Sequence, residues 1–150
     1  MTTFAREMLC EVVQEVQPLL LAHHEELTPR KDLRRLNPQW KAYALLEQLE
    51  RYAIFTARDE RGALVGYGGF HVVRHLHDAD FAMAQNDLFY IVPERRRGTT
   101  AMSFLHYCEE QLVALPVRMI CYLGCAGNNL LPILHRLGYA DEPVMASKYF

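Results

Sequence analysis

The chain has 150 residues, of which 51% are hydrophobic, and no Pro/Gly/Ser-rich linker divides it, so we expect a single domain over residues 1–150. Its formal net charge of −2 gives no overall attraction to nucleic acid, so any anion-binding site must be local. Because no apolar run approaches the roughly 20 residues that span a bilayer, and acidic residues interrupt the first apolar ones, we expect a cytoplasmic protein with neither a membrane segment nor a secretory signal.

Two helices are predicted in the first third of the chain. Apolar side chains recur at three-to-four spacing over residues 9–27, which indicates a helix that Pro18 should kink or interrupt near Gln17. After a polar, proline-containing connection, the next helix should begin with Asn37 as its N-cap and Pro38 in its first position. Three leucines of this second helix are expected to face the core: Leu45, Leu46 and Leu49.

The hydrophobic period then changes to that of strands. We predict three strands in succession, separated by short reversals: residues 52–58, 63–73 and 81–92. Pro93 should end the third strand because it has no N–H to donate to a ladder.

The last third alternates between helix and strand. A helix opens at Gly98, and its apolar side chains are spaced four, three and four apart at Ala101, Leu105, Cys108 and Leu112. Three further elements follow: a strand at 117–125, a short helix at 128–139 that Gly138 closes, and a strand at 143–150. The order predicts a mixed α/β (α+β) fold in which helices pack on a mainly antiparallel sheet.

Cysteines and histidines have no spacing typical of a metal site. Cys121 and Cys125 are spaced CxxxC, but a structural zinc site needs a second pair of ligands at suitable spacing. We therefore expect reduced, buried thiols and no bound metal.

The arginine-rich turn "ERRRGTTA" (residues 94–101) carries the strongest chemical signal. The first amides of a helix lack acceptors inside the helix, and its dipole places partial positive charge there. Gly98 lets an anion approach the backbone, and Arg95, Arg96 and Arg97 add forked donors suited to phosphate oxygens. The turn therefore has the composition of a phosphate site, although a solvated turn that caps the helix would have the same composition. A P-loop is excluded because no lysine follows Gly98. A dinucleotide fingerprint is excluded because the glycine-rich stretch "GYGGFH" (residues 66–71) lies within a predicted strand.

Several segments together resemble one family. The quoted stretches are "VPERRRGTTAMSFL", "LLPILHRLGYADEP", "HHEEL", "NPQWKAYALLEQL" and "LVGYGGFHVVRHLH". They resemble the GNAT (Gcn5-related) N-acetyltransferases, and within them small acetyltransferases encoded by bacteriophages and prophages. The resemblance implies a GNAT-like, mainly antiparallel sheet flanked by helices on both faces. It also implies direct transfer of an acetyl group from acetyl-CoA, as co-substrate, to a primary amine.

The resemblance places the donor on particular residues. Ile91 and Val92 would offer main-chain groups to pantetheine and to the acetyl carbonyl. The pyrophosphate loop would consist of Arg96, Arg97, Gly98, Thr99, Thr100 and Ala101. Arg97 and Thr99 stand where the usual pattern has glycine, and Thr99 narrows the loop.

Candidates for proton transfer come from three places. Glu26 lies three residues after His23 on one helical face, and we expect it to hold or deprotonate the amine, although "HHEEL" also suits a polar helix end. His77, in the reversal before the third strand, is the second candidate base, with simple exposure as its alternative. Leu134 stands where many relatives carry the tyrosine that protonates the thiolate, which leaves water, Tyr139 or Tyr149 for that step.

Two other functions stay open. A GNAT-fold protein that binds CoA without turnover is favoured by the leucine at 134, and a nucleic-acid-binding module is disfavoured by the negative net charge. The acceptor would be a cationic small molecule, if Glu25, Glu26 and Asp87 form an acidic pocket, or a protein amine. The resemblance also makes a homodimer and a bacterial host cytoplasm reasonable expectations.

Overall fold

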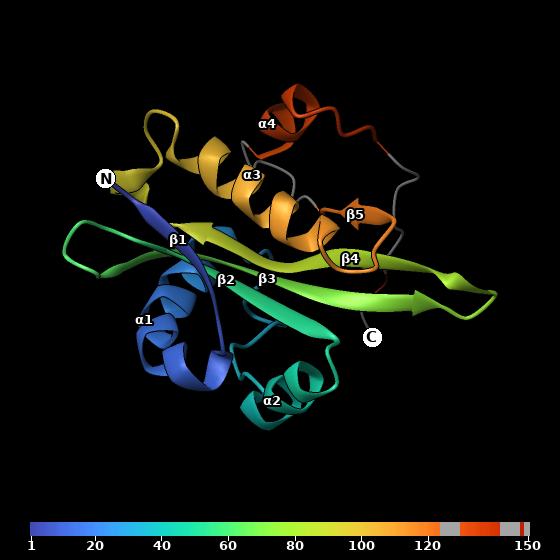
Figure 1. Cartoon of the computed structure of the whole chain (residues 1–150). Helices are drawn as coiled ribbons and strands as arrows, with labels where there is room; N and C mark the ends of the chain where they lie inside the picture. The colour runs from blue at the N-terminus through green and yellow to red at the C-terminus, as the bar shows by residue number, and fades with distance from the viewer. Residues whose placement is uncertain (124–129, 142–147, 149–150) are drawn as a thin grey trace.

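Figure 1 shows the computed structural model, which describes residues 1–123, 130–141 and 148. Its strands form one sheet in the order β1 (Thr3–Glu7), β2 (Tyr52–Arg58), β3 (Leu64–His75), β4 (Asp78–Ile91) and β5 (Met119–Cys121). Neighbouring strands are antiparallel from β1 to β4, and β5 is parallel to β4. The predicted mixed, mainly antiparallel sheet is therefore confirmed.

Helices cover both faces of this sheet, as expected (Figure 1). One face carries α1 (Leu9–Leu27) and α2 (Trp40–Gln48), the other α3 (Thr100–Val113) and α4 (Leu130–Arg136). A large cluster of buried side chains lies on each face of the sheet, and a third, smaller one joins Leu105 of α3 to Leu130 and Leu134 of α4. The first joins Val12 and Val16 to Ile54 and Tyr67; the second joins Phe104, Cys108 and Leu112 to Phe55 and Phe70.

The two N-terminal helices differ from the prediction. Pro18 lies inside α1 without ending it, since the helix is continuous from Leu9 to Leu27 and is anchored by buried side chains on either side of the proline. The start predicted at Asn37 and Pro38 is wrong, because α2 begins at Trp40. Leu45 and Leu49 are exposed, and the side chains that pack on the core are Trp40, Tyr43 and Leu46. Aromatic side chains thus take the face that leucines were expected to fill.

Differences also occur at the two ends of the chain. β1 was not predicted; it is a short edge strand whose Phe4 packs against Phe104 at a ring separation of 5.3 Å. The strand predicted at 117–125 is confirmed only as β5, and residues 124 and 125 lie outside the described residues. The strand predicted at 143–150 also lies outside them, apart from Lys148. Gly138 has a φ of +90°, as the predicted helix ending requires. Within the described residues, no helix is long and apolar enough to cross a membrane.

Two irregularities of β4 create an opening at the edge of the sheet: a bulge at Asp87 and the end of its pairing with β5. The register with β3 passes from Gly69↔Leu88 to Phe70↔Asn86, which leaves Asp87 as an unpaired, bulged residue. The pairing of β4 with β5 covers only Met83 to Gln85 of β4, so the strands part beyond that point. The side chain of Asn86 caps the junction, because its Oδ1 accepts a hydrogen bond from the Leu123 N–H at 2.5 Å.

Candidate functional site

The edge of β4 beyond the junction is open. Val92 donates its N–H to the Val65 carbonyl at 2.9 Å, and the antiparallel ladder alternates, so the main-chain groups of Ile91 and Phe89 point away from β3. On that side β5 has already diverged. The Ile91 N–H therefore faces the open side, while its carbonyl accepts a hydrogen bond from Arg96 Nε at 2.7 Å, so its contacts with pantetheine stay a prediction. Val92 offers no free main-chain group there, because its N–H binds the Val65 carbonyl and its carbonyl accepts from the Arg95 N–H at 2.9 Å. Phe89 was not among the predicted site residues. Its main-chain N–H and carbonyl point to the open side of β4, as those of Val92 were expected to.

This open edge leads to the turn before α3. Gly98 has a φ of +75°, a conformation that favours glycine, and Thr99 is the N-cap residue without a side-chain cap. Among the described residues, no acceptor receives a hydrogen bond from the N–H groups of Gly98, Thr99, Thr100 or Ala101. These amides and the helix dipole make a local site of positive potential, at a helix that begins at Thr100 rather than at the predicted Gly98.

The three arginines of the turn do not act together. Arg95 forms ion pairs with Asp59 and Glu60, at 3.3 and 3.4 Å. Arg96 binds Glu26 in a bidentate pair, with N–O distances of 2.5 and 2.7 Å. Within the described residues, Arg97 alone of the three has no carboxylate partner. Carboxylates of the chain itself therefore offset most of the repulsion that suggested a bound anion, and one guanidinium is left for a ligand.

Glu26 lies in the last turn of α1 and is held by Arg96 through both carboxylate oxygens. The hydrogen bonds from Arg96 keep the pKa of Glu26 below its usual value. The same guanidinium donates from Nε to the Ile91 carbonyl at 2.7 Å and lies 5.1 Å from the centre of the Tyr90 ring. In this arrangement Glu26 ties the end of α1 to the turn that precedes α3. Glu25 is similarly paired with Lys31, at 3.0 Å.

A cavity of about 240 Å³ lies between the second half of α1, the segment after it and the bulge of β4. Its lining includes His23, His24, Arg34, Asn86, Asp87 and Phe89. Neither Glu25 nor Glu26 lines it, so the acidic pocket suggested by the sequence is not formed. Besides the histidines, its described lining carries one carboxylate, that of Asp87, and one guanidinium, that of Arg34.

Asp87 is held at the floor of this cavity by two tyrosines. Its Oδ2 accepts hydrogen bonds from the hydroxyls of Tyr43 at 2.8 Å and Tyr52 at 3.1 Å, while its Oδ1 has only His71 Nε2, at 3.8 Å. Burial raises the pKa of the Tyr52 hydroxyl, and the nearby Asp87 raises it further, so Tyr52 stays protonated and donates. The Asp87 side chain is 25% exposed although the residue as a whole is exposed, which means that the backbone of the bulge is open. Asp87 thus lines the cavity with an exposed backbone and a side chain that keeps one oxygen, Oδ1, without a close partner.

His23 is the second polar group of the cavity wall. Its Nδ1 lies 2.8 Å from the Tyr67 hydroxyl, and its ring stacks on Tyr90 with centroids 5.0 Å apart. Burial lowers the pKa of His23 to about 4, so the imidazole is neutral at neutral pH.

This buried histidine predicts a pH dependence of stability. The pKa of His23 is about 4 in the folded protein, against 6.5 ordinarily, so between these values the unfolded chain binds a proton that the folded chain does not. The free energy of unfolding should therefore fall, by at most about 3 kcal/mol, as the pH is lowered from about 6.5 towards 4. Urea unfolding at several pH values measures this fall in the free energy of unfolding for the wild type and for His23→Gln. Between pH 6.5 and 5 the free energy of unfolding of the variant should depend less on pH than that of the wild type. Equal slopes in the two proteins would contradict the assignment.

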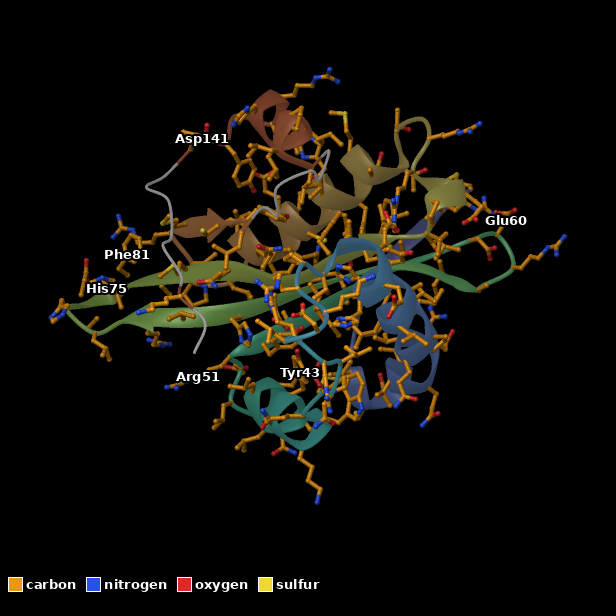
Figure 2. The ribbon with its side chains drawn as sticks, turned by 180° about the vertical axis from the view of Figure 1, so that it is seen from behind. Tyr43, Arg51, Glu60, His75, Phe81 and Asp141 are labelled. Carbon is orange, nitrogen blue, oxygen red and sulfur yellow. The ribbon has the colours of Figure 1, made fainter. Side chains whose placement is uncertain are left out.

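The remaining sequence-predicted groups lie away from the cavity. His77 is in the turn after β3, and Figure 2 shows its neighbour His75 at the outer end of the β3–β4 hairpin, far from Tyr43. Ten residues of extended strand separate Asp78 from Leu88, or roughly 33 Å, which is too far for direct proton transfer to the cavity. Leu134 is buried in α4, and Tyr139 donates to Glu109 at 3.5 Å. Tyr149 lies outside the described residues.

Within the described residues, no group of three or more His, Cys, Asp or Glu side chains could hold a metal ion. Cys10, Cys108 and Cys121 are free thiols, of which only Cys108 is fully buried, and Cys125 lies outside the described residues.

Three of the solved structures with a similar arrangement are acetyltransferases. An aminoglycoside acetyltransferase from an uncultured soil metagenomic sample matches with a TM-score of 0.78 at 13% identity, over 100% of this chain and 99% of that one. The ribosomal-protein-alanine N-acetyltransferase of Brucella melitensis biovar Abortus 2308 matches with a TM-score of 0.74 at 16% identity, over 100% and 99%. Another soil metagenomic aminoglycoside acetyltransferase, solved in complex with sisomicin, matches with a TM-score of 0.75 at 12% identity, over 99% and 95%.

No protein-family model and no curated protein sequence matches the chain. At these identities the likeness shows the fold, and the fold is the GNAT fold that the resemblance implied.

Proposed function

We propose that the protein transfers an acetyl group from acetyl-CoA to a primary amine. The observation that carries the proposal is the junction at which β4 and β5 part, because it joins an open strand edge, a cavity with a carboxylate and a helix N-terminus with free amides. The fold shared with known acetyltransferases supports the same function.

The donor would lie along this edge. The amides from Gly98 to Ala101 and the Arg97 guanidinium would bind the pyrophosphate, with Thr99 and Thr100 adding hydroxyls. Pantetheine would follow the open edge of β4 at Ile91 and Phe89. Arg96 already donates to the Ile91 carbonyl, so its part is to shape this path rather than to bind phosphate.

The acceptor would enter from the other side of the junction, where the cavity lies. The Asp87 Oδ1 attracts the amine and takes its proton, directly or through a water molecule. The amine nitrogen then bonds to the thioester carbonyl carbon, and the N–H of Phe89 stabilises the oxyanion. The carbonyl re-forms as the C–S bond breaks, the nitrogen gives up its second proton to solvent, and the leaving thiolate takes a proton from solvent, because Leu134 has none to give.

In this scheme Glu26 positions Arg96 rather than acting as the base. His77 takes no part, because the hairpin carries it away from the junction. The His23 imidazole is neutral at neutral pH, so it adds no positive charge to the cavity that would repel the amine.

One observation favours a second function. Leu134 is 3% exposed in α4 and replaces the usual proton donor, which suits a protein that binds CoA without turnover. Calorimetric titration with CoA, together with thiol release from acetyl-CoA over a panel of amines, separates the two. Binding with thiol release supports the enzyme, binding without release across the panel supports the second function, and no binding contradicts both.

Because Arg95 and Arg96 are paired with carboxylates and Arg97 is not paired within the described residues, the three arginines should contribute differently to CoA binding. Arg97→Ala should weaken CoA binding about tenfold or more, because a charge-assisted hydrogen bond to phosphate is worth roughly 1.5–3 kcal/mol, or about 10- to 150-fold in Kd. Arg95→Ala is the matched control and should change the Kd by less than about twofold, because Arg95 is paired with Asp59 and Glu60. Equal effects of the two substitutions, measured calorimetrically at one salt concentration, would show that the turn does not hold the pyrophosphate as proposed.

A further inference from the structure

We propose that the acceptor is a small amine that also carries an anionic group, and that Arg34 binds that group. This inference rests on the proposed function and names the substrate class of the same cavity. It starts from the charges of the described cavity lining, which are one carboxylate at Asp87 and one guanidinium at Arg34.

Arg34 differs from its neighbours on the segment between α1 and α2. Arg30 is paired with Asp32 at 3.2 Å, and Lys31 with Glu25 at 3.0 Å. Within the described residues, the guanidinium of Arg34 has no hydrogen-bond or ion-pair partner, while its N–H is fixed by the Arg30 carbonyl at 3.0 Å. A guanidinium held at the wall of a cavity without a carboxylate has its forked donors available for a carboxylate or phosphate group.

Asp87 supplies the complementary contact at the floor. Its Oδ2 is occupied by the hydroxyls of Tyr43 and Tyr52, but Oδ1 has only the distant His71 nitrogen. One oxygen is therefore available to an ammonium group, next to the strand edge where the thioester would lie. An acceptor that bridges Asp87 and Arg34 satisfies both charges, whereas an acceptor with several ammonium groups leaves one of them against Arg34.

The volume of the cavity also indicates a small acceptor. Its volume of about 240 Å³ is below the roughly 300–1,000 Å³ of pockets that enclose drug-sized ligands. Leu20, Leu27, Leu36 and Leu88 make part of its wall apolar. An α-amino acid with an aliphatic side chain has the size, the two charges and the apolar part that this lining matches.

The test uses acceptors that differ only in the anionic group. Leucine is compared with leucinamide, O-phosphoethanolamine with ethanolamine, and γ-aminobutyrate with its amide, in thiol-release assays with acetyl-CoA. The first and third pairs probe a carboxylate at two distances from the amine, and the second probes a phosphate. The amide of an amino acid has a more acidic ammonium group, so each ratio of kcat/KM is judged by how a substitution changes it.

Arg34→Ala should lower kcat/KM for the preferred anionic acceptor about tenfold or more, mostly through KM, and leave its uncharged analogue within about twofold. Arg35→Ala is the matched control, because Arg35 lies on the same segment but does not line the cavity, and it should change neither. Arg34→Glu should reverse the preference. The inference is overturned if Arg34→Ala leaves every ratio unchanged, or if the wild type prefers none of the anionic acceptors.

Failure of the proposed function gives a different result. If CoA binds but no amine is acetylated, calorimetric titration of the CoA-loaded protein with leucine and with leucinamide still decides the inference. Tighter binding of leucine that Arg34→Ala abolishes supports it, and equal binding of the two overturns it. If CoA does not bind, the same titrations on the protein alone decide it in the same way.

Discussion

Replacing Asp87 by asparagine should lower kcat/KM at least about a hundredfold, because the charge that attracts the amine and the base that takes its proton are lost together. Asparagine has nearly the same shape and can still accept the hydroxyls of Tyr43 and Tyr52, so the fold should be preserved. The affinity for CoA should stay within about twofold. Steady-state thiol release, with calorimetry for CoA, makes the measurement.

Glu26→Gln is the matched variant for this prediction. It removes the other carboxylate that the sequence suggested as base, but its expected effect is on the Arg96 contact and so on CoA binding. If Glu26→Gln abolishes transfer with unchanged CoA affinity while Asp87→Asn changes kcat/KM less than threefold, Glu26 is the base and the assignment of Asp87 is wrong.

Replacing Gly69 by alanine should destabilise the protein by about 2 kcal/mol, since overpacking a buried site costs roughly 1–3 kcal/mol. A Cβ at position 69 would lie 2.9 Å from Cζ of the Tyr52 ring and closer still to its hydroxyl. The Tyr52 ring crosses this glycine to reach Asp87, so the substitution should also lower activity. Urea unfolding measures the loss of stability.

Removal of the hydroxyl provides the control. The double variant Gly69→Ala/Tyr52→Phe should lose less free energy of unfolding than the sum of the two single variants, because the hydroxyl that the new methyl group meets is already gone. Strict additivity, or a Gly69→Ala variant as stable as the wild type, would show that Tyr52 does not depend on the glycine.

The elements with a clear period were predictable from the sequence, and those stabilised by distant contacts were not. The stripe from Leu105 to Leu112 gave α3, because three-to-four spacing of buried side chains is local information. The edge strand β1 has only five residues, and its pairing with β2 lies about fifty residues away in sequence. The start of α2 was wrong because packing of Trp40 and Tyr43 outweighed the capping preference of Asn37.

The candidate site divides in the same way. The amides without partners at the turn before α3 were predictable, because the first N–H groups of a helix have no acceptor within it, but the positive φ of Gly98 was not predicted. The partners of the arginines in this turn were not predictable either, because Glu26 lies 70 residues from Arg96 and Asp59 36 residues from Arg95. Asp87 was noticed as an acid in a strand, but only the β-bulge and the two tyrosines identify it as the carboxylate of the cavity.

A crystal structure with CoA bound tests the central claim most directly. The predicted result places the diphosphate within hydrogen-bonding distance of the N–H groups from Gly98 to Thr100, with pantetheine along Phe89 and Ile91 and the thiol beside Asp87. A diphosphate bound elsewhere, or a thiol remote from the Asp87 cavity, would contradict both the donor site and the proposed transfer.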